Sequence, residues 1–226
     1  MKIKHHPDDS TLMSYAAGSL PSVLSAVVAA HVDMCLHCRR ELRLMESVGL
    51  AMLEQLPVDA GRLRAPVLAL RKLESVVESK PNGHPAAVAG ATSNAGQSID
   101  VPAPLRHLVG ERLDGIRWKK LGFGVWHHPL PVPARSKGVL TLLKIEPGRN
   151  MPEHGHGGAE LTLMLSGAYS DHTGRYQRGD LADLDGDVEH RPVADKDVGC
   201  ICLVASERKA SFKGVVARLV QPWTGL

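Results

Sequence analysis

The sequence lacks several features that mark common classes of protein. It has no uninterrupted apolar run of the roughly 18 residues that a membrane-spanning helix needs, and its N-terminus, MKIKHHPDDS, has no apolar core of a secretory signal. Only 4% of the residues are aromatic and the formal net charge is +3, which provides neither a base-stacking platform nor a strong phosphate-binding field. We therefore expect a cytoplasmic protein with no membrane association and no direct binding of nucleic acid.

The composition is nevertheless that of a folded protein. Hydrophobic residues make up 43% of the 226 residues and charged residues 23%, which is typical of globular chains. Cysteine is scarce and paired in sequence: Cys35 with Cys38, and Cys200 with Cys202. Because disulfides are rare in the cytoplasm, the first pair favours metal or redox chemistry. The second pair lies in the apolar run VGCICLVA, so we interpret these cysteines as small core residues of a buried strand.

The N-terminal part of the sequence has helical periodicity. Apolar residues recur at helical spacing after a cap at Asp8–Ser10, again after Pro21, and then over 42–56 and 63–77. These patterns predict four short helices. The periodicity stops near residue 80, and the next 20 or so residues are rich in Gly, Ala, Ser, Asn and Pro, which is typical of a flexible linker.

The C-terminal part has a different pattern, in which short apolar runs alternate with turn residues. The runs are Val139–Ile145, Glu160–Leu165, Gly199–Ala205 and Gly214–Val220. Short strands separated by turns predict an antiparallel barrel or sandwich. The predicted organisation is a helical domain over 1–80, a linker over 81–100 and a β domain over 101–226.

A first candidate metal site lies in the stretch HVDMCLHC, which has the spacing His31-x3-Cys35-x2-Cys38. Residues three or four apart share a helix face, so Cys35 and Cys38 can face one ion together, and His31 can reach the same ion from the end of the preceding helix. Zinc binds such ligands in a tetrahedron. His37 lies about 200° around a helix from Cys35 and is a poor candidate. The fourth ligand is His5 or His6, and spacing does not choose between them. A closed four-ligand site would be structural, and we favour zinc over a redox-active or unligated cysteine pair.

A second candidate metal site follows Gly148 in the stretch GRNMPEHGHGGAELTLMLSG. His154, His156 and Glu160 are separated by even numbers of residues and would share one face of a regular strand, with Gly167 at the turn that follows. His190 is a fourth candidate from another strand. Three imidazoles and a carboxylate suit zinc, iron, manganese, nickel or copper. The alternative is a barrel without metal that holds hydrogen-bonded histidines.

This second stretch resembles the first motif of the cupin family, which it matches at every spaced position from Gly148 to Gly167. The second cupin motif is kept only at Gly179 and His190. The remaining positions differ: Asp185 and Asp187 replace its usual proline and second glycine, and Ala194 stands where asparagine is usual. We expect these departures to affect the turn more than the ligand set.

Together, the helical His/Cys motif and the cupin motif resemble the ChrR-like anti-sigma factors of bacteria. The resemblance implies a small all-α zinc-binding bundle followed by an all-β, jelly-roll-like cupin barrel. It implies that the bundle binds a sigma factor of the extracytoplasmic-function type and blocks its access to RNA polymerase. It also implies that the cupin domain serves the response to an oxidative signal such as singlet oxygen. The implied metal ligands are His6, His31, Cys35 and Cys38 in the bundle, and His154, His156, Glu160 and His190 in the cupin.

Two other functions compete with this regulatory, non-enzymatic role. A metal-dependent cupin enzyme, such as a dioxygenase or isomerase, would use the same three histidines and glutamate, with the helices as a docking domain. A barrel enzyme has no need of the N-terminal His/Cys motif, so this motif favours the regulator. A DNA-binding zinc protein is disfavoured because the sequence has no basic stripe.

Overall fold

The computed structural model describes residues 2–55, 100–122, 124–133, 136–208 and 211–212. The N-terminal region forms three helices: α1 (Asp9–Ala16), α2 (Ser22–Met34) and α3 (Leu36–Glu54). They lie where periodicity predicts the first three helices. The predicted fourth helix, nearly all of the linker and the strand at Gly214–Val220 lie outside the described residues. None of the described helices combines the length and apolar character needed to cross a bilayer.

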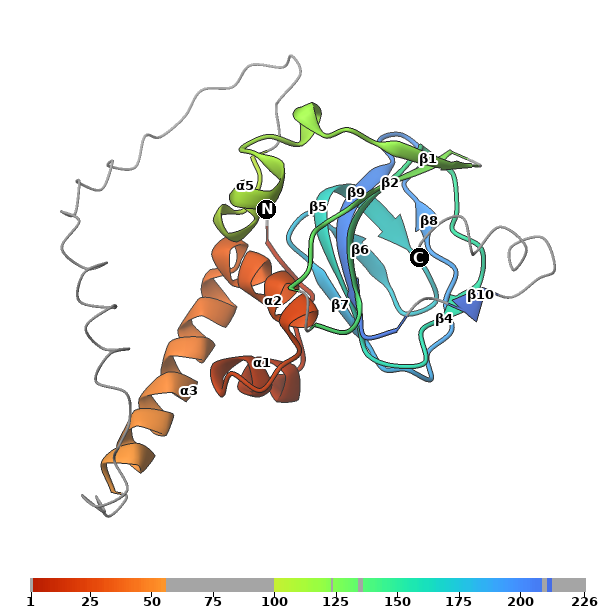
Figure 1. Cartoon of the computed structure of the whole chain (residues 1–226). Coiled ribbons are helices and arrows are strands. Elements are labelled where there is room, and N and C mark those ends of the chain that lie inside the picture. The colour runs from red at the N-terminus through yellow and green to blue at the C-terminus, as the bar shows by residue number, and fades with distance from the viewer. Residues whose placement is uncertain (1, 56–99, 123, 134–135, 209–210, 213–226) are drawn as a thin grey trace. The chain divides into compact units, whose positions relative to one another are not determined.

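The second described region begins with short helical turns and continues as strands (Figure 1). The turns are η1 (Ala103–Leu105), α5 (Arg106–Val109) and η2 (Leu113–Gly115). The strands are β1 (Lys119–Gly122), β2 (Val125–Pro129), β3 (Val139–Ile145), β4 (His154–Gly155), β5 (Glu160–Ser170), β6 (Arg175–Gln177), β7 (Leu181–Leu184), β8 (Val193–Ala194), β9 (Cys200–Ser206) and β10 (Ser211–Phe212).

All described strand pairs are antiparallel, as the sequence predicts. The main sheet has the order β1-β2-β3-β9-β5-β6, β7 and β8 also pair with β5, and β4 pairs with β10. Strand β5 is therefore central, because it pairs with β9 and also with the three short strands β6, β7 and β8. The strand that begins at Glu160 thus holds much of the β region together.

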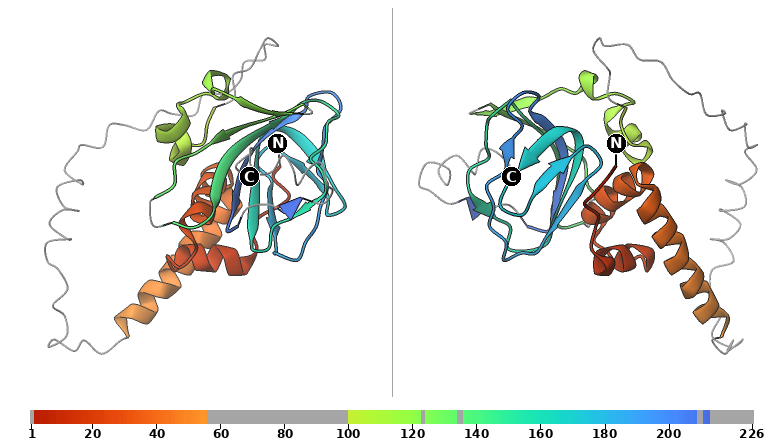
Figure 2. Two further views of the ribbon diagram at one scale, coloured as in Figure 1. Left: turned by 45° about the vertical axis from the view of Figure 1, so that its right-hand side comes forward. Right: turned by 180° about the vertical axis from the view of Figure 1, so that it is seen from behind.

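Strand β5 is buried on both faces, and this explains its near-continuous apolar sequence. Leu161, Leu163 and Leu165 belong to a core cluster that also contains Val27 of α2, whereas Met164 belongs to a second cluster. Helix α2 contacts both β5 and β9, so it covers the outer face of the sheet (Figures 1 and 2). Residues Met1–Gly49 and Ser98–Leu226 accordingly form one compact unit.

Gly167 does not end its strand, which corrects the expectation of a hairpin turn there. Strand β5 continues to Ser170, and its pairing with β9 shifts register between Met164 and Ser166. Gly167 adopts a φ of +67°, and a Cβ at this position would lie 2.0 Å from the carbonyl oxygen of Gly199. The glycine therefore allows two backbones to come close together just beyond the bulge.

Candidate metal centres

Four side chains from the N-terminal region converge, and they are the four that the resemblance implies. The candidate ligand atoms of His6, His31, Cys35 and Cys38 all lie within 4.8 Å of one another. His6 precedes α1, His31 lies in the last turn of α2, and Cys38 lies in the first turn of α3. The cluster therefore joins three segments of the chain.

Cys35 lies at the break between two helices. Its spacing had placed it on a helix together with Cys38. It ends α2 with extended backbone angles, φ −111° and ψ 108°, and α3 begins at the next residue. Its N–H still donates to the carbonyl of His31 at 2.8 Å, while its own carbonyl accepts from Arg39 at 3.1 Å. This turn presents both sulfurs to His31. His37 is exposed and lies outside the cluster, as expected.

The hydrogen bonds of the two imidazoles direct one nitrogen of each toward the sulfurs. His31 Nδ1 lies 3.0 Å from the carbonyl oxygen of Gly179 and donates to it, which leaves Nε2 facing Cys38 Sγ at 3.3 Å. His6 Nδ1 lies 3.4 Å from Cys35 Sγ and 3.3 Å from Cys38 Sγ. Ligands held tetrahedrally at zinc distances lie about 3.3–3.8 Å apart, and these three nitrogen–sulfur distances match that separation.

His5, the alternative fourth ligand, is directed elsewhere. Its Nδ1 lies 3.4 Å from a carboxylate oxygen of Asp180, and its ring packs against Tyr176. The structure thus brings His6 into the cluster and keeps His5 out of it.

Burial favours the neutral forms of the groups in this cluster. Burial and the neighbouring Cys35 raise the pKa of the Cys38 thiol to about 12. Burial also lowers the pKa of His31 to about 4, which keeps this imidazole neutral near neutral pH. A neutral imidazole is a ready ligand, whereas the thiolates that zinc binds require a positive charge beside them.

The second cluster brings together His154, His156, Glu160 and His190, again within 4.8 Å. The stretch from His154 to Glu160 does not form one strand, which corrects the sequence interpretation. His154 lies in β4 and Glu160 begins β5, with a turn at Gly157 and Gly158 between them. His154 and His190 exchange backbone hydrogen bonds of 3.2 and 3.1 Å, which places their imidazoles side by side.

Hydrogen bonds on the outer side of these rings leave nitrogen lone pairs on the inner side. His154 Nδ1 donates to Pro152 O at 2.8 Å, and His190 Nδ1 donates to Asp171 Oδ2 at 2.9 Å. Nε2 of His190 then faces Nε2 of His156 at 3.1 Å. Imidazole nitrogens that bind one metal ion lie about this far apart, so the donor set fits a divalent metal ion.

Asp171 contacts a member of this cluster, and sequence reasoning missed it. Its side chain is almost fully buried. Although burial opposes its ionisation, the hydrogen bonds from His190 and Thr173 lower the pKa of Asp171 to about 2. An ionised Asp171 fixes the tautomer of His190 and increases its basicity as a ligand. Asp171 and His190 are 19 residues apart, with strands β6 and β7 between them, and no spacing rule connects them.

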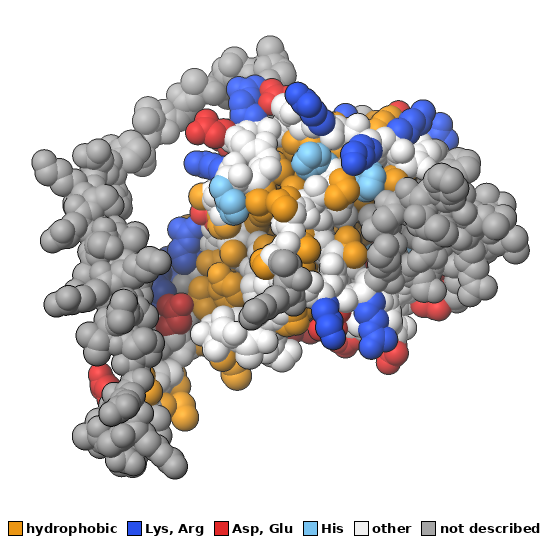
Figure 3. Space-filling view, in the orientation of Figure 1, with side chains coloured by type: hydrophobic (Ala, Val, Ile, Leu, Met, Phe, Trp, Pro, Cys, Tyr) orange, Lys and Arg blue, Asp and Glu red, His pale blue; other side chains and the backbone are white. Residues whose placement is uncertain are grey.

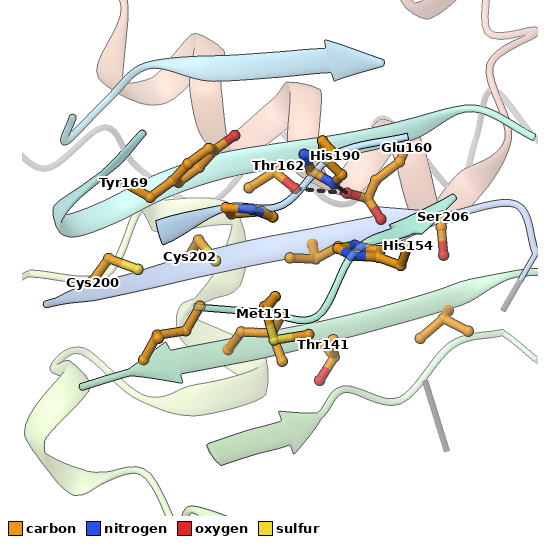
Figure 4. A pocket seen from close by; sticks show the side chains of 15 residues that line it. Thr141, Met151, His154, Glu160, Thr162, Tyr169, His190, Cys200, Cys202 and Ser206 are labelled. Atoms are coloured by element: carbon orange, nitrogen blue, oxygen red, sulfur yellow. Dashed lines mark hydrogen bonds and ion pairs between the residues drawn. The ribbon is translucent and has the colours of Figure 1, made fainter. Parts of the chain in front are cut away.

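A cavity of about 50 Å³ lies beside this cluster. Glu160, His154 and His190 lie toward one end of it, and Cys200, Cys202 and Tyr169 toward the other (Figure 4). The two cysteines are buried strand residues of β9, as interpreted from the sequence, and both face this cavity. The space beside the cluster admits only one or two groups the size of water.

Known proteins match the chain along nearly its full length. The sequence model of the ChrR cupin-like domain matches residues 108–210. The anti-sigma-E factor ChrR of Cereibacter sphaeroides is 36% identical over 223 residues, which cover 99% of each chain. A solved structure, Rhodobacter sphaeroides SigE in complex with the anti-sigma ChrR, matches with a TM-score of 0.69 and 35% identity over 91% of this chain and all of that one.

The fold and the two clusters define a regulator-type architecture: a helical region with a His/Cys cluster joined to a cupin. The chain belongs to the ChrR family of anti-sigma factors. Since this is a family of regulators, it favours the regulator over the cupin enzyme. Both clusters are consistent with metal binding.

Proposed function

We propose that this protein binds a sigma factor of the extracytoplasmic-function type in the cytoplasm and keeps it from RNA polymerase. The observation that carries the proposal is the extent of the match to ChrR, which covers the helical region as well as the cupin. The solved relative is bound to SigE, and it matches 91% of this chain. A partner of the same class is therefore the simplest expectation for this protein.

Helix α3 offers a surface suited to such a partner. Leu44 and Val48 are one helical turn apart and are 61% and 53% exposed. Further exposed apolar side chains follow at Leu50, Met52 and Leu53. Figure 3 shows hydrophobic side chains over the helical part of the molecule. Apolar side chains arranged along one helix are a common docking element.

We propose that the N-terminal cluster holds Zn²⁺ with His6, His31, Cys35 and Cys38. A closed four-ligand zinc site is structural, and it would contribute its binding energy to folding. Because the ligands come from three segments, the ion would fix α2, α3 and the segment before α1 in one arrangement. The shape offered to the sigma factor would then depend on the metal.

We propose that the second cluster holds Zn²⁺ or another divalent transition metal and serves the response to an oxidative signal such as singlet oxygen. Its four ligands are buried and converge beside the small cavity, which supports a site that admits only small molecules. The second cluster lies in the β region and not in the helices, which supports a role in the response and not in sigma binding.

Co-purification tests the first role. The full chain is co-expressed with sigma factors of this type from the organism that encodes it, and the complex is isolated. Cys35→Ser should abolish the complex, because it removes a zinc ligand. The matched control is Cys200→Ser, another buried cysteine that is not in either cluster. A complex that survives both metal removal and Cys35→Ser would contradict the role given to zinc.

The second role requires a separate variant. His154→Ala should leave the sigma complex intact but slow its dissociation when a photosensitiser generates singlet oxygen. Loss of the complex without any oxidant would show that the cupin cluster is needed for binding itself, and this division of roles would be wrong.

A further inference from the structure

The loop between β6 and β7 reaches across to the N-terminal cluster. The carbonyl of Gly179 accepts the hydrogen bond from His31 Nδ1 at 3.0 Å. The side chain of Asp180 accepts from the backbone N–H groups of Lys4 and His5, at 2.6 and 3.1 Å. The next N–H along the loop, that of Leu181, donates to the carbonyl of His5 at 3.1 Å. Both imidazole-bearing segments of the cluster are thus attached to one loop of the β region.

Asp180 is built into the fold as an ionised acceptor. Its side chain is fully buried. Burial opposes ionisation, but the backbone N–H groups of Lys4, Gln177 and His5 outweigh it and lower the pKa of Asp180. One carboxylate oxygen accepts from the N-terminal segment, and the other accepts from Gln177 at 3.0 Å in its own loop. The same side chain therefore shapes its loop and holds the N-terminal segment.

Gly179 allows the N-terminal segment to come close. Its φ is +88°, and a Cβ there would lie 2.7 Å from the side chain of Ile3. A side chain at this position would be strained and would push Ile3 away. The glycine that the cupin motif retains thus also makes room for the segment that carries His6.

We propose that Gly179 and Asp180 are positioning residues of the N-terminal metal site, and that the cupin region thereby sets the affinity of this site. Gly179 fixes the tautomer and direction of the His31 ring, and Asp180 fixes the backbone next to His6. Partners of this kind raise metal affinity because they orient the ligands before the metal binds. The inference rests on the proposed function in one respect, that the His/Cys cluster binds a metal.

The test uses the full chain with Co²⁺ as the probe. Thiolate-to-Co²⁺ charge transfer reports the N-terminal cluster, because the other cluster contains no sulfur ligand, and Cys35→Ser provides the blank. Asp180→Asn cannot satisfy both sets of N–H donors with its one oxygen. It should lower the affinity for Co²⁺, measured against a chelator, about 10- to 100-fold. The d–d bands should also change as His6 is released.

The matched control is Asp195→Asn. Asp195 has a similar hydrogen-bonding pattern: one oxygen accepts from two backbone N–H groups, of Asp197 and Val198, and the other from Arg175. It lies in neither cluster, so its substitution should leave the affinity and the spectrum unchanged. A loss of affinity equal to that of Asp180→Asn would show a general effect on the fold and overturn the inference.

A second variant breaks the same contact from the other side. Lys4→Pro removes the N–H that donates to Asp180 and leaves the cupin loop untouched, with Lys2→Pro as its control. It should also weaken Co²⁺ binding, and it decides the matter if Asp180→Asn does not fold. If the wild-type chain shows charge transfer and both variants match it, this inference alone is wrong. If the wild type shows none, the metal assignment fails and the inference fails with it.

Discussion

At the scale of single residues, the two ligand sets were predictable in part. Local spacing gave His31, Cys35 and Cys38, because residues one helical turn apart share a face. It did not separate His6 from His5, since the choice depends on a contact between His5 and Asp180, 175 residues away. Spacing also placed Cys35 on a helix, whereas it lies in the break between two. Short-range rules thus identify ligands but not the backbone that directs them.

The role of Asp171 leads to a prediction about the cupin cluster. Asp171→Asn replaces the ionised acceptor of His190 with a weaker, neutral one and allows the ring to take the other tautomer. We expect the affinity of this cluster for Zn²⁺ or Co²⁺ to fall about 10- to 100-fold. Metal content after dialysis against a chelator measures it. The exposed carboxylate Asp114, substituted in the same way, is the control. Equal metal retention in both variants would contradict the role given to Asp171.

At the scale of helices and strands, the sequence predicted what is periodic and local. Strand β3 coincides with the predicted run, and α1 to α3 lie where apolar spacing places helices. The short strands β4, β6 and β8 were not predicted, because two or three residues carry no period. The end of β5 was misplaced because Gly167, a common turn residue, here allows a close approach to the backbone of Gly199, and only the paired strand shows this.

The exposed residues of α3 give a prediction at this scale. Val48→Asp puts a carboxylate into the proposed apolar interface, where its desolvation is not compensated. We expect recovery of the co-expressed sigma factor to fall on the order of tenfold or more. The free energy of unfolding of the free protein should change by no more than about 0.5 kcal/mol, because the side chain is exposed.

The control for this prediction lies on the side of the helix away from the row formed by Leu44, Val48 and Met52. Arg43→Asp introduces the same carboxylate about 140° around the helix from Val48, and it should leave the complex intact. If Arg43→Asp weakens the complex as much as Val48→Asp does, a general charge effect is at work. The assignment of the apolar side of α3 to the partner would then be wrong.

At the scale of the whole molecule, periodicity could not identify what covers each apolar face. The sequence shows that α2 has apolar residues on one side, but it does not show that β5 and β9 are their partners. Likewise, the apolar residues on both faces of β5 are consistent with any covering layer. Pairing across more than a hundred residues depends on shape and packing, which a single sequence does not display. The boundary predicted over 81–100 stays a prediction.

The shared core predicts that helices and sheet unfold together. Leu24 of α2 and Leu163 of β5 are both buried in the same cluster, one on each side of the contact. Truncating either leucine to alanine should lower the free energy of unfolding by about 2–5 kcal/mol. Since the two elements share a core, both variants should shift one common unfolding transition. Circular dichroism follows the helices, and tryptophan fluorescence follows the sheet, because Trp118 lies near it and Trp126 within it.

The control is Leu50→Ala, which changes an exposed leucine of α3 and should shift the transition little. If Leu24→Ala moved only the helical signal and left the fluorescence transition in place, helices and sheet would be separate folding units, and α2 would not be part of the core that supports β5.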